Sequence, residues 1–441
     1  MSIVHYKEKE GVGELRVRRR NYTTREVRRG KVARMKVIAI NCGSSTLKFQ
    51  LIEVQDEDVI LGREKRLASG TIDRIGGNGF IQFTAESGKY VQETAVVNNH
   101  GEASRRVLSW LSSIGLLGPD GLEAVGHRVV HGGDRFVEPV LIDDEVINAI
   151  ATLGHLAPLH NGPSLEAIRA AREALGPSVP QVATFDTAFH RLLPERASHY
   201  AIPYQLAAKH NIRRYGFHGL AHRYMTERYA TMMATPLDKV KIITLQLGNG
   251  CSATAVAGGC SVDTSMGLTP LEGLMMGTRS GDIDPSLAVF LAQQEDVTAE
   301  EVENWLNTKS GLLGVSGCSS DMRELLKAEC QGDARAALAV EMFCYRVKKY
   351  IGSYLAALGG ASGIVFGGGI GENTPKVRAR ILAGMEWCGL ELDERRNVDT
   401  KGVEGRISTD DATLHVYVIP VNEATIIARD TVRCLRHNHK G

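Results

Sequence analysis

Residues 37–49, with the sequence VIAINCGSSTLKF, are the most informative part of this chain. The segment reads as an apolar strand, a turn of small polar residues and a second strand that carries Lys48. Small residues let backbone N–H groups approach an anion, hydroxyls add donors, and a lysine adds a compact positive charge. This combination predicts a phosphate-binding strand–turn–strand unit, unlike a P-loop, in which the glycine turn leads into a helix. Alone, the segment is equally consistent with an ordinary β-hairpin.

Two related segments occur further along the chain. Residues 242–252 (IITLQLGNGCS) again form a strand, a glycine turn and an emerging strand, about half a chain after the first unit. Residues 363–373 (GIVFGGGIGEN) form a third strand that ends in glycines, followed by a helix that Thr374 and Pro375 open. Two phosphate hairpins and a glycine-rich loop in this order predict a duplicated fold with ATP between the halves.

The composition is that of a soluble globular enzyme. The chain has 441 residues, of which 43% are hydrophobic and 23% charged, and its length suggests two domains. A run of about 18 apolar residues, which a membrane span needs, does not occur. The eight cysteines include no Cys-x-x-Cys pair, which argues against structural zinc and a disulfide framework and favours a cytoplasmic location.

The first 34 residues differ in charge from the rest. They hold 11 Lys/Arg and four Asp/Glu, a net charge of +7, whereas the remainder carries −6. A basic front is typical of nucleic-acid contact or a transit peptide, but the four glutamates and the missing apolar segment fit neither well. Because Met35 directly precedes the first strand, we interpret residues 1–34 as a disordered extension or an upstream start, with no role in nucleic-acid or membrane binding.

The remaining sequence alternates strands with amphipathic helices, which indicates an α/β fold. Helices are expected at 102–116, 143–153, 164–175 and 333–358, and a late strand at 415–420. The longest helix has apolar residues at helical spacing that we expect in the core: Phe343, Val347, Tyr350, Ile351 and Leu355.

Arginine, histidine and aspartate recur in short, glycine-bearing or apolar segments. These segments are residues 126–133, 156–161, 185–190, 213–219 and 276–285. An arginine presents a planar fork that matches a carboxylate or a phosphate. Each histidine alone is more often structural than catalytic. Together with phosphate-binding turns, the segments favour phosphoryl transfer to a small anion.

These motifs, from Met35 to about Ala428, resemble the acetate kinase (acetokinase) family of the acetate and sugar kinase, heat-shock and actin superfamily. The resemblance implies two actin-like (ribonuclease H-like) domains from a duplicated βββαβαβα-type unit, with ATP in the cleft between them. Domain I would comprise residues 35–187 and 424–441, and domain II residues 188–423. The resemblance further implies a homodimer and reversible phosphoryl transfer between ATP and acetate, with magnesium, or manganese as an alternative.

The resemblance also implies roles for individual residues. Asp186, His218 and Arg279 would surround the phosphoryl group, Arg128 would bind the acetate carboxylate, and Asn41 and Glu423 would serve the metal. The walls of the methyl pocket would be Val130, Leu159, Phe217 and Pro270. The ATP site would be lined by Lys48, Gln246, Leu247, Gly248, Asn249, Gly250, Asp321, Met322, Arg323, Gly369, Ile370, Gly371, Glu372 and Asn373. Asp321 and Glu324 also match a helix capping box.

The chemistry is consistent with this assignment. A carboxylate nucleophile, with a reference pKa of about 4, is ionised at neutral pH and needs no general base. Asp186 is therefore expected to orient its neighbours more than to remove a proton. The sequence departs from the family pattern at Gln246, where histidine is usual, and at Leu220–Ala221, where threonine and serine are usual. It also departs at Gly162, where proline is usual, and at Ala424, where a second glutamate is common. Two alternatives stay open: a kinase for propionate or another short-chain acid, and a non-catalytic actin-like ATP-binding regulator.

Overall fold

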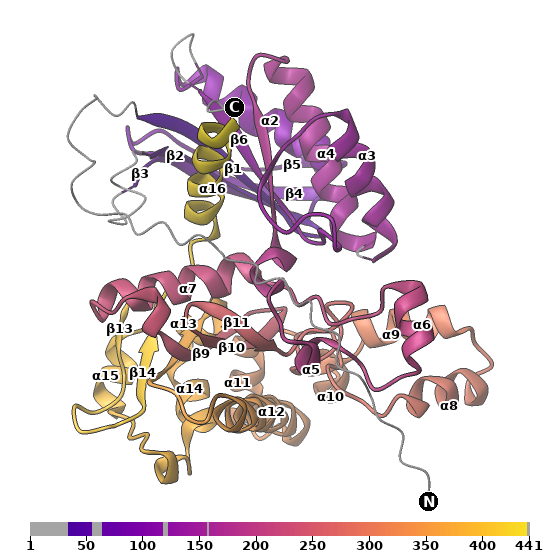
Figure 1. The fold of residues 1–441 in the computed structure, drawn as a ribbon, viewed down its shortest axis with the longest axis vertical. Helices are drawn as coiled ribbons and strands as arrows, with labels where there is room; N and C mark the ends of the chain where they lie inside the picture. Colours follow the sequence, from indigo (N-terminus) through magenta and orange to yellow (C-terminus); the bar gives the residue numbers. More distant parts are fainter. Residues whose placement is uncertain (1–33, 55–63, 118–121, 157, 439–441) are drawn as a thin grey trace, which may run out of the picture. The chain divides into compact units, whose positions relative to one another are not determined.

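The structure, a computed structural model, describes residues 34–54, 64–117, 122–156 and 158–438, without the side chains of residues 155–160 and 438. The expected N-terminal extension lies, except for Arg34, outside these residues. Within them the chain forms two mixed sheets flanked by helices, which confirms the α/β class (Figure 1). In the described part of the chain, no helix is both long and apolar enough to cross a membrane.

The first sheet has eight strands in the order β5-β4-β3-β2-β1-β6-β8-β7. Strands β1 to β5 pair with one another in antiparallel fashion, whereas β6 is parallel to both β1 and β8. The strands are β1 (Met35–Cys42), β2 (Thr46–Val54), β3 (Lys65–Asp73), β4 (Gly77–Ala85), β5 (Tyr90–Val97), β6 (Ala124–Val129), β7 (Val140–Leu141) and β8 (Gln181–Phe185).

The second sheet repeats this plan with six strands in the order β11-β10-β9-β12-β14-β13. A hairpin, β9–β10, again stands beside two parallel strands, β12 and β14. The strands are β9 (Lys241–Leu247), β10 (Cys251–Ala257), β11 (Cys260–Thr264), β12 (Gly363–Gly367), β13 (Gly405–Arg406) and β14 (His415–Val418). The shared order supports the duplication predicted from the two hairpin sequences.

Helices cover both faces of each sheet. The α-helices are α2 (His100–Ser113), α3 (Asp144–Thr152), α4 (Pro158–Leu175), α5 (Glu195–Ser198), α6 (Tyr204–His210), α7 (Gly219–Met232), α8 (Ser286–Gln294), α9 (Ala299–Thr308), α10 (Gly311–Ser316), α11 (Met322–Cys330), α12 (Ala334–Leu358), α13 (Gly368–Asn373), α14 (Pro375–Leu382), α15 (Glu394–Asp399) and α16 (Glu423–Asn438). The 3₁₀ turns are η1 (Leu153–Leu156), η2 (Asp186–His190), η3 (Leu237–Lys239) and η4 (Glu386–Cys388). Helices α2 and α4 pack on one face of the first sheet and α16 on the other, while α7 and α12 cover opposite faces of the second.

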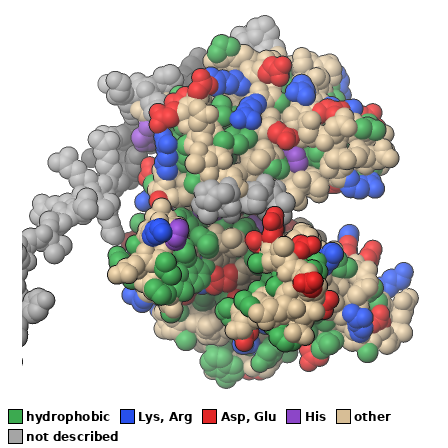
Figure 2. Space-filling view, turned by 90° about the vertical axis from the view of Figure 1, so that its right-hand side faces the viewer, with side chains coloured by type: hydrophobic (Ala, Val, Ile, Leu, Met, Phe, Trp, Pro, Cys, Tyr) green, Lys and Arg blue, Asp and Glu red, His purple; other side chains and the backbone are tan. Residues whose placement is uncertain are grey.

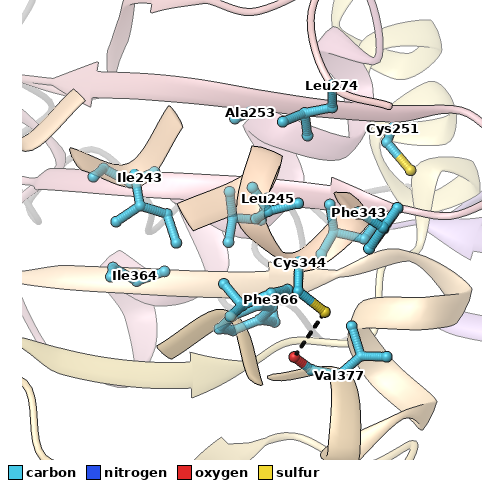
Figure 3. Packing of buried hydrophobic residues seen from close by; sticks show 14 of the residues in the cluster. Ile243, Leu245, Cys251, Ala253, Leu274, Phe343, Cys344, Ile364, Phe366 and Val377 are labelled. Carbon is cyan, nitrogen blue, oxygen red and sulfur yellow. Dashed lines mark hydrogen bonds between the residues drawn. The ribbon is translucent and has the colours of Figure 1, made fainter. Parts of the chain in front are cut away.

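The largest core cluster joins the second sheet to α12 and α14. In Figure 3, Leu245 and Phe366 from neighbouring parallel strands lie among the side chains that pack with Phe343 of α12 and Val377 of α14. The expected core residues of α12 are buried except Tyr350, which is half-buried because its hydroxyl donates to Asp282 Oδ2 at 2.7 Å. Burying these apolar side chains stabilises the second sheet, and the glycine turns begin where its strands β9 and β12 end.

Helices α7 and α16 pack against each other through Leu220, one of the departures from the family pattern. Leu220 is 3% exposed and lies in a small apolar cluster with Ala39, Ile426 and Ile427. Here a hydroxyl would need a hydrogen-bond partner, whereas leucine fills an apolar contact. Arg223 of α7 also donates to Asp430 of α16 at 2.8 Å.

One local prediction was wrong. The glycine-rich segment after β12 was expected to be a loop, but residues Gly368–Asn373 form the short helix α13. Gly368 has φ +77°, and a Cβ there would lie 2.6 Å from the carbonyl oxygen of Leu247, so only glycine fits this approach. The Glu372 side chain accepts from the Gly368 N–H at 2.8 Å, which satisfies a donor at the start of the helix.

Candidate functional site

Arg128 and Asp186 form a bidentate ion pair at the ends of two neighbouring parallel strands. Arg128 lies in β6, and Asp186 follows β8 as the first residue of η2. The Nε and Nη2 atoms of Arg128 donate to the two carboxylate oxygens of Asp186 at 2.9 and 2.5 Å. The Asp186 side chain is fully buried. The arrangement holds the guanidinium plane in one orientation.

The ion pair continues toward the first hairpin and the C-terminal helix. Arg128 Nη1 donates to Asn41 Oδ1 at 2.9 Å, and Asn41 Nδ2 donates to Glu423 Oε2 at 2.5 Å. Burial alone would lower the pKa of Arg128, but the charges of Asp186 and Glu423 outweigh it and raise that pKa above its usual value. A guanidinium has five N–H groups, of which these contacts use three, so two stay available for a bound anion.

His218 approaches the same carboxylate through its backbone. Its N–H donates to Asp186 Oδ2 at 3.3 Å, and its φ of +56° places it at the N-cap of α7. Gly219 permits this turn, because a Cβ there would lie 1.9 Å from the Asp186 carbonyl oxygen. His218 Nδ1 is 2.8 Å from Ser252 Oγ, which is in turn 2.7 Å from His222 Nε2.

Arg279 has a different electrostatic environment from Arg128. Among the described residues its side chain contacts neutral groups: Nη1 donates to the Pro270 carbonyl at 3.4 Å and lies 3.9 Å from Met276 Sδ. Burial lowers its pKa, opposed only by Cys251, and among the described residues no carboxylate pairs with it. A partly buried guanidinium without a counter-charge attracts an anionic ligand.

His218, Gly250 and Arg279 come together although they are distant in sequence. A Cβ placed on Gly250 would lie 3.4 Å from His218 Nε2 and 3.6 Å from Arg279 Nη1. Gly250 ends the glycine turn between β9 and β10, so a phosphate at this turn could contact the imidazole and the guanidinium together.

Of the expected methyl-pocket residues, Val130 and Phe217 are buried in the same core cluster. They are 2% and 1% exposed, so in this structure both side chains are almost fully enclosed by the protein. Pro270 is half-buried and connects to Arg279 through its carbonyl. The side chain of Leu159 lies outside the described residues.

The hairpin lysine and several expected nucleotide residues line one cavity of about 570 Å³. Lys48 and Asn41 pair directly across β1 and β2, so their side chains project from the same face of the sheet. Gln246, at the end of β9, faces this cavity, and among the described residues its Oε1 is buried without a hydrogen-bond partner. The expected site residues that line the cavity are Asn41, Lys48, Gln246, Gly369, Glu372 and Glu423.

Residues 321–323 do not line this cavity. Asp321 caps α11 by accepting from Arg323 N at 2.8 Å, but the reciprocal half of the predicted capping box is absent. Glu324 instead accepts from Ser319 Oγ at 2.5 Å, because that hydroxyl lies between the two acidic residues and also accepts from Asp321 N. Met322 is 2% exposed and packs in the largest core cluster.

Asn41 and Glu423 line the cavity with oxygen atoms that could hold a divalent cation. Mg²⁺ is bound by one or two carboxylates, with water and phosphate oxygens as its other ligands. Among the described residues, no group of three His, Cys, Asp or Glu side chains could form an all-protein metal site. One amide and one carboxylate at the wall of an open cavity therefore fit a magnesium ion that arrives with a nucleotide.

Sequence reasoning did not identify Ser252, which contacts His218, or His222, which contacts Ser252. Burial lowers the pKa of His222 well below its usual value, with further lowering by His190 and His218. The spacing of His218 and His222, four residues apart at the start of a helix, was the one sequence signal that could have joined them.

Comparisons with known proteins identify the family of this chain. Residues 36–429 match the model of the acetokinase family. The chain is 49% identical over 413 residues to the acetate kinase of Chloroherpeton thalassium, which covers 91% of this chain and 99% of that protein. It is 50% identical over 407 residues to the acetate kinase of Solibacter usitatus, covering 91% and 98%.

Solved structures show the same similarity. Porphyromonas gingivalis acetate kinase superposes with a TM-score of 0.82 at 41% identity, covering 91% of this chain and all of that one. A propionate kinase from Francisella tularensis superposes with a TM-score of 0.83 at 38% identity, covering 90% and 99%. The chain belongs to the acetokinase family.

Proposed function

We propose that this enzyme transfers a phosphoryl group reversibly between ATP and acetate, giving ADP and acetyl phosphate. The observation that carries the proposal is the connected set formed by Glu423, Asn41, Arg128, Asp186 and the His218 backbone. In this set, Asp186 accepts from both Arg128 and the His218 backbone. Arg128 is the residue that we propose binds the carboxylate of the substrate.

Acetate would bind to the two remaining N–H groups of Arg128, with its methyl group against Val130 and Phe217. Asp186 accepts both bonds from the guanidinium, so its role is to orient Arg128 rather than to accept a proton. One acetate oxygen forms the new bond to the γ-phosphorus. The bond from phosphorus to the bridging oxygen breaks, and ADP leaves with that electron pair.

Charge in the transition state would be stabilised by Arg279, His218 and the glycine turn at Gly250. Arg279 suits this role because no carboxylate in the described part of the chain neutralises its charge. Bound magnesium would neutralise nucleotide phosphate charge near Asn41 and Glu423, and manganese could replace it. Lys48 lies on the wall of the same cavity, where a nucleotide phosphate could contact it.

We further propose that the nucleotide binds between two domains, residues 35–187 with 424–441 and residues 188–423. The cavity supports this proposal because its walls come from both sheets: Lys48 belongs to β2, and Gln246 to β9. The eight cysteines form no disulfide, which supports our proposal of a cytoplasmic location.

The direct test is to trap the acyl phosphate as its hydroxamate after incubating the purified protein with ATP, Mg²⁺ and acetate, propionate or butyrate. We expect hydroxamate with acetate at the highest kcat/KM. A protein that binds ATP but forms no hydroxamate with any acid would be the non-catalytic regulator. Propionate is the second candidate substrate, because the chain also resembles a solved propionate kinase.

Val130→Ala is expected to shift the preference from acetate toward propionate. A shorter side chain leaves room for an added methylene, worth about 1–3 kcal/mol in an apolar pocket, so the ratio of kcat/KM values should change about tenfold. The matched control is Val129→Ala, because Val129 is equally buried but packs in another cluster. An unchanged ratio would place Val130 outside the pocket.

We also propose a homodimer in which α8 lies at the contact between the two copies. None of the nine residues of α8 is buried, although the helix is rich in apolar residues. Val289 is 60% and Phe290 56% exposed, and Leu287 is also exposed. The side of the molecule that carries α8 in Figure 1 faces the viewer in Figure 2, where hydrophobic side chains lie among charged ones. An apolar helix without a buried face is typical of a surface that a partner covers.

Phe290→Glu is expected to convert the dimer to a monomer, because a carboxylate cannot be desolvated cheaply at the centre of an apolar contact. Sedimentation velocity of the full-length protein measures this directly. Trp387→Glu is the control, since Trp387 is 74% exposed on η4, a different element. A Phe290→Glu protein that still sediments as a dimer would exclude α8 from the interface.

A further inference from the structure

Arg378 is a fully buried arginine outside the site described above. It lies in α14 with 0% exposure, and burial lowers its pKa to about 10. Within the described part of the chain, no carboxylate forms an ion pair with it. A buried guanidinium held only by neutral groups is costly, so a specific function is needed to explain it.

The contacts of Arg378 join two segments. Nη1 donates to the carbonyl oxygens of Gly371 and Glu372 at 2.8 and 2.9 Å. Nε and Nη2 donate to Asn397, to its side-chain Oδ1 at 2.8 Å and to its carbonyl oxygen at 2.5 Å. Gly371 and Glu372 are in the last turn of α13, and Asn397 is in α15.

Helix α13 depends on such contacts because it is short. It has six residues, and the last carbonyls of any helix have no partner within the helix. These carbonyls also carry the negative end of the helix dipole, which a cation stabilises. At the other end, Glu372 Oε1 accepts from the N–H groups of Gly368 and Val421 at 2.8 and 3.0 Å.

We infer that Arg378 is a positioning residue for ATP, which acts by fixing α13 against α15 at the wall of the nucleotide cavity. The inference rests on the proposed nucleotide role of Gly369 and its neighbours, and it adds a residue that touches no substrate. Gly369 and Glu372 line the cavity, whereas Arg378 approaches α13 from the protein interior. Val377, beside Arg378, packs in the core and anchors α14 (Figure 3).

Lysine cannot replace the planar guanidinium of Arg378, which presents several N–H donors in fixed directions. One nitrogen of the Arg378 guanidinium donates to α13, and the other two donate to Asn397. An ammonium group is a single point donor on a flexible chain, so Arg378→Lys keeps the charge but cannot join both segments. Arg380→Lys is the matched control. Arg380 lies on the same helix, but its guanidinium pairs with Glu329 of α11, at 2.7 and 2.9 Å, instead of with α13.

The test measures KM for ATP at saturating acetate, KM for acetate at saturating ATP, the Kd of ADP by calorimetry, and amide hydrogen exchange across α13. In Arg378→Lys we expect KM for ATP and Kd for ADP to rise about tenfold, as for a lost hydrogen bond to a charged group. We expect KM for acetate to change less than about twofold, the range of an ordinary surface change. Amide exchange in α13 should become faster, and Arg380→Lys should match the parent protein in all four measurements.

Three outcomes would overturn the inference: unchanged ATP and ADP constants, an equal rise in both KM values, or a lower melting temperature and kcat as the only effects. If Arg378→Lys does not fold, Asn397→Ala is the second variant. It removes the acceptor of Nε but keeps the contacts with α13, and it should raise KM for ATP by a smaller factor. The parent protein separates the two proposals, because failure to form acyl phosphate in the parent contradicts the proposed function before any variant is compared.

Discussion

Replacing Arg128 with alanine is expected to raise KM for acetate at least a hundredfold, with little change in the Kd of ATP. The change removes the charged donors proposed for the acetate carboxylate and also leaves the fully buried Asp186 without its partner. Breaking a buried pair in this way costs about 3–5 kcal/mol, so the melting temperature should fall as well. Steady-state kinetics, calorimetry with ATP and a thermal melt measure the three effects.

Two further variants separate these causes. Arg128→Lys keeps a positive charge near Asp186 but cannot form both bonds of the fork, so it should recover stability more than acetate affinity. Arg135→Ala, which removes an exposed arginine paired with Glu145, should leave kinetics and stability nearly unchanged. An Arg128→Ala enzyme with the acetate KM of the parent would refute the assignment of Arg128 to the carboxylate.

Asp186→Asn is expected to lower kcat about a thousandfold while the pH dependence of the residual activity stays as in the parent. An asparagine has the same shape but presents an NH₂ group where one carboxylate oxygen accepts from Arg128, so two donors would face each other. Arg128 and the His218 backbone, both of which Asp186 holds, would then lose their orientation together. Effects of this size are common when aligned groups are displaced.

The control for Asp186→Asn is Asp430→Asn. Asp430 is 2% exposed and pairs with Arg223 and Arg433, so this change also weakens a buried ion pair, but in α7 and α16 away from the reacting groups. It should reduce the melting temperature without changing kcat per folded molecule. If Asp186→Asn instead removed one limb of the pH–rate profile, Asp186 would be a proton acceptor and the orienting role would be wrong.

The fold class could be predicted from the sequence because its signals are local. The hairpin at residues 37–49, its relative at residues 242–252 and the strand at residues 363–367 are recognised by periodicity and by small residues at turns. The structure confirms them as β1–β2, β9–β10 and β12. The error at α13 has a local cause too: a glycine-rich run predicts a loop, but the Glu372 side chain and the Arg378 guanidinium satisfy its backbone.

By itself, the sequence determined the α/β class, the duplicated hairpins and the arginine, histidine and aspartate residues of the candidate site. Only the tertiary structure decided which of these residues meet. It paired Arg128 with Asp186 and left Arg279 without a carboxylate among the described residues, a distinction that the two sequence motifs do not contain. The physical reason is that an arginine's role depends on its counter-charges and its burial, which are set by strands and helices distant in the sequence.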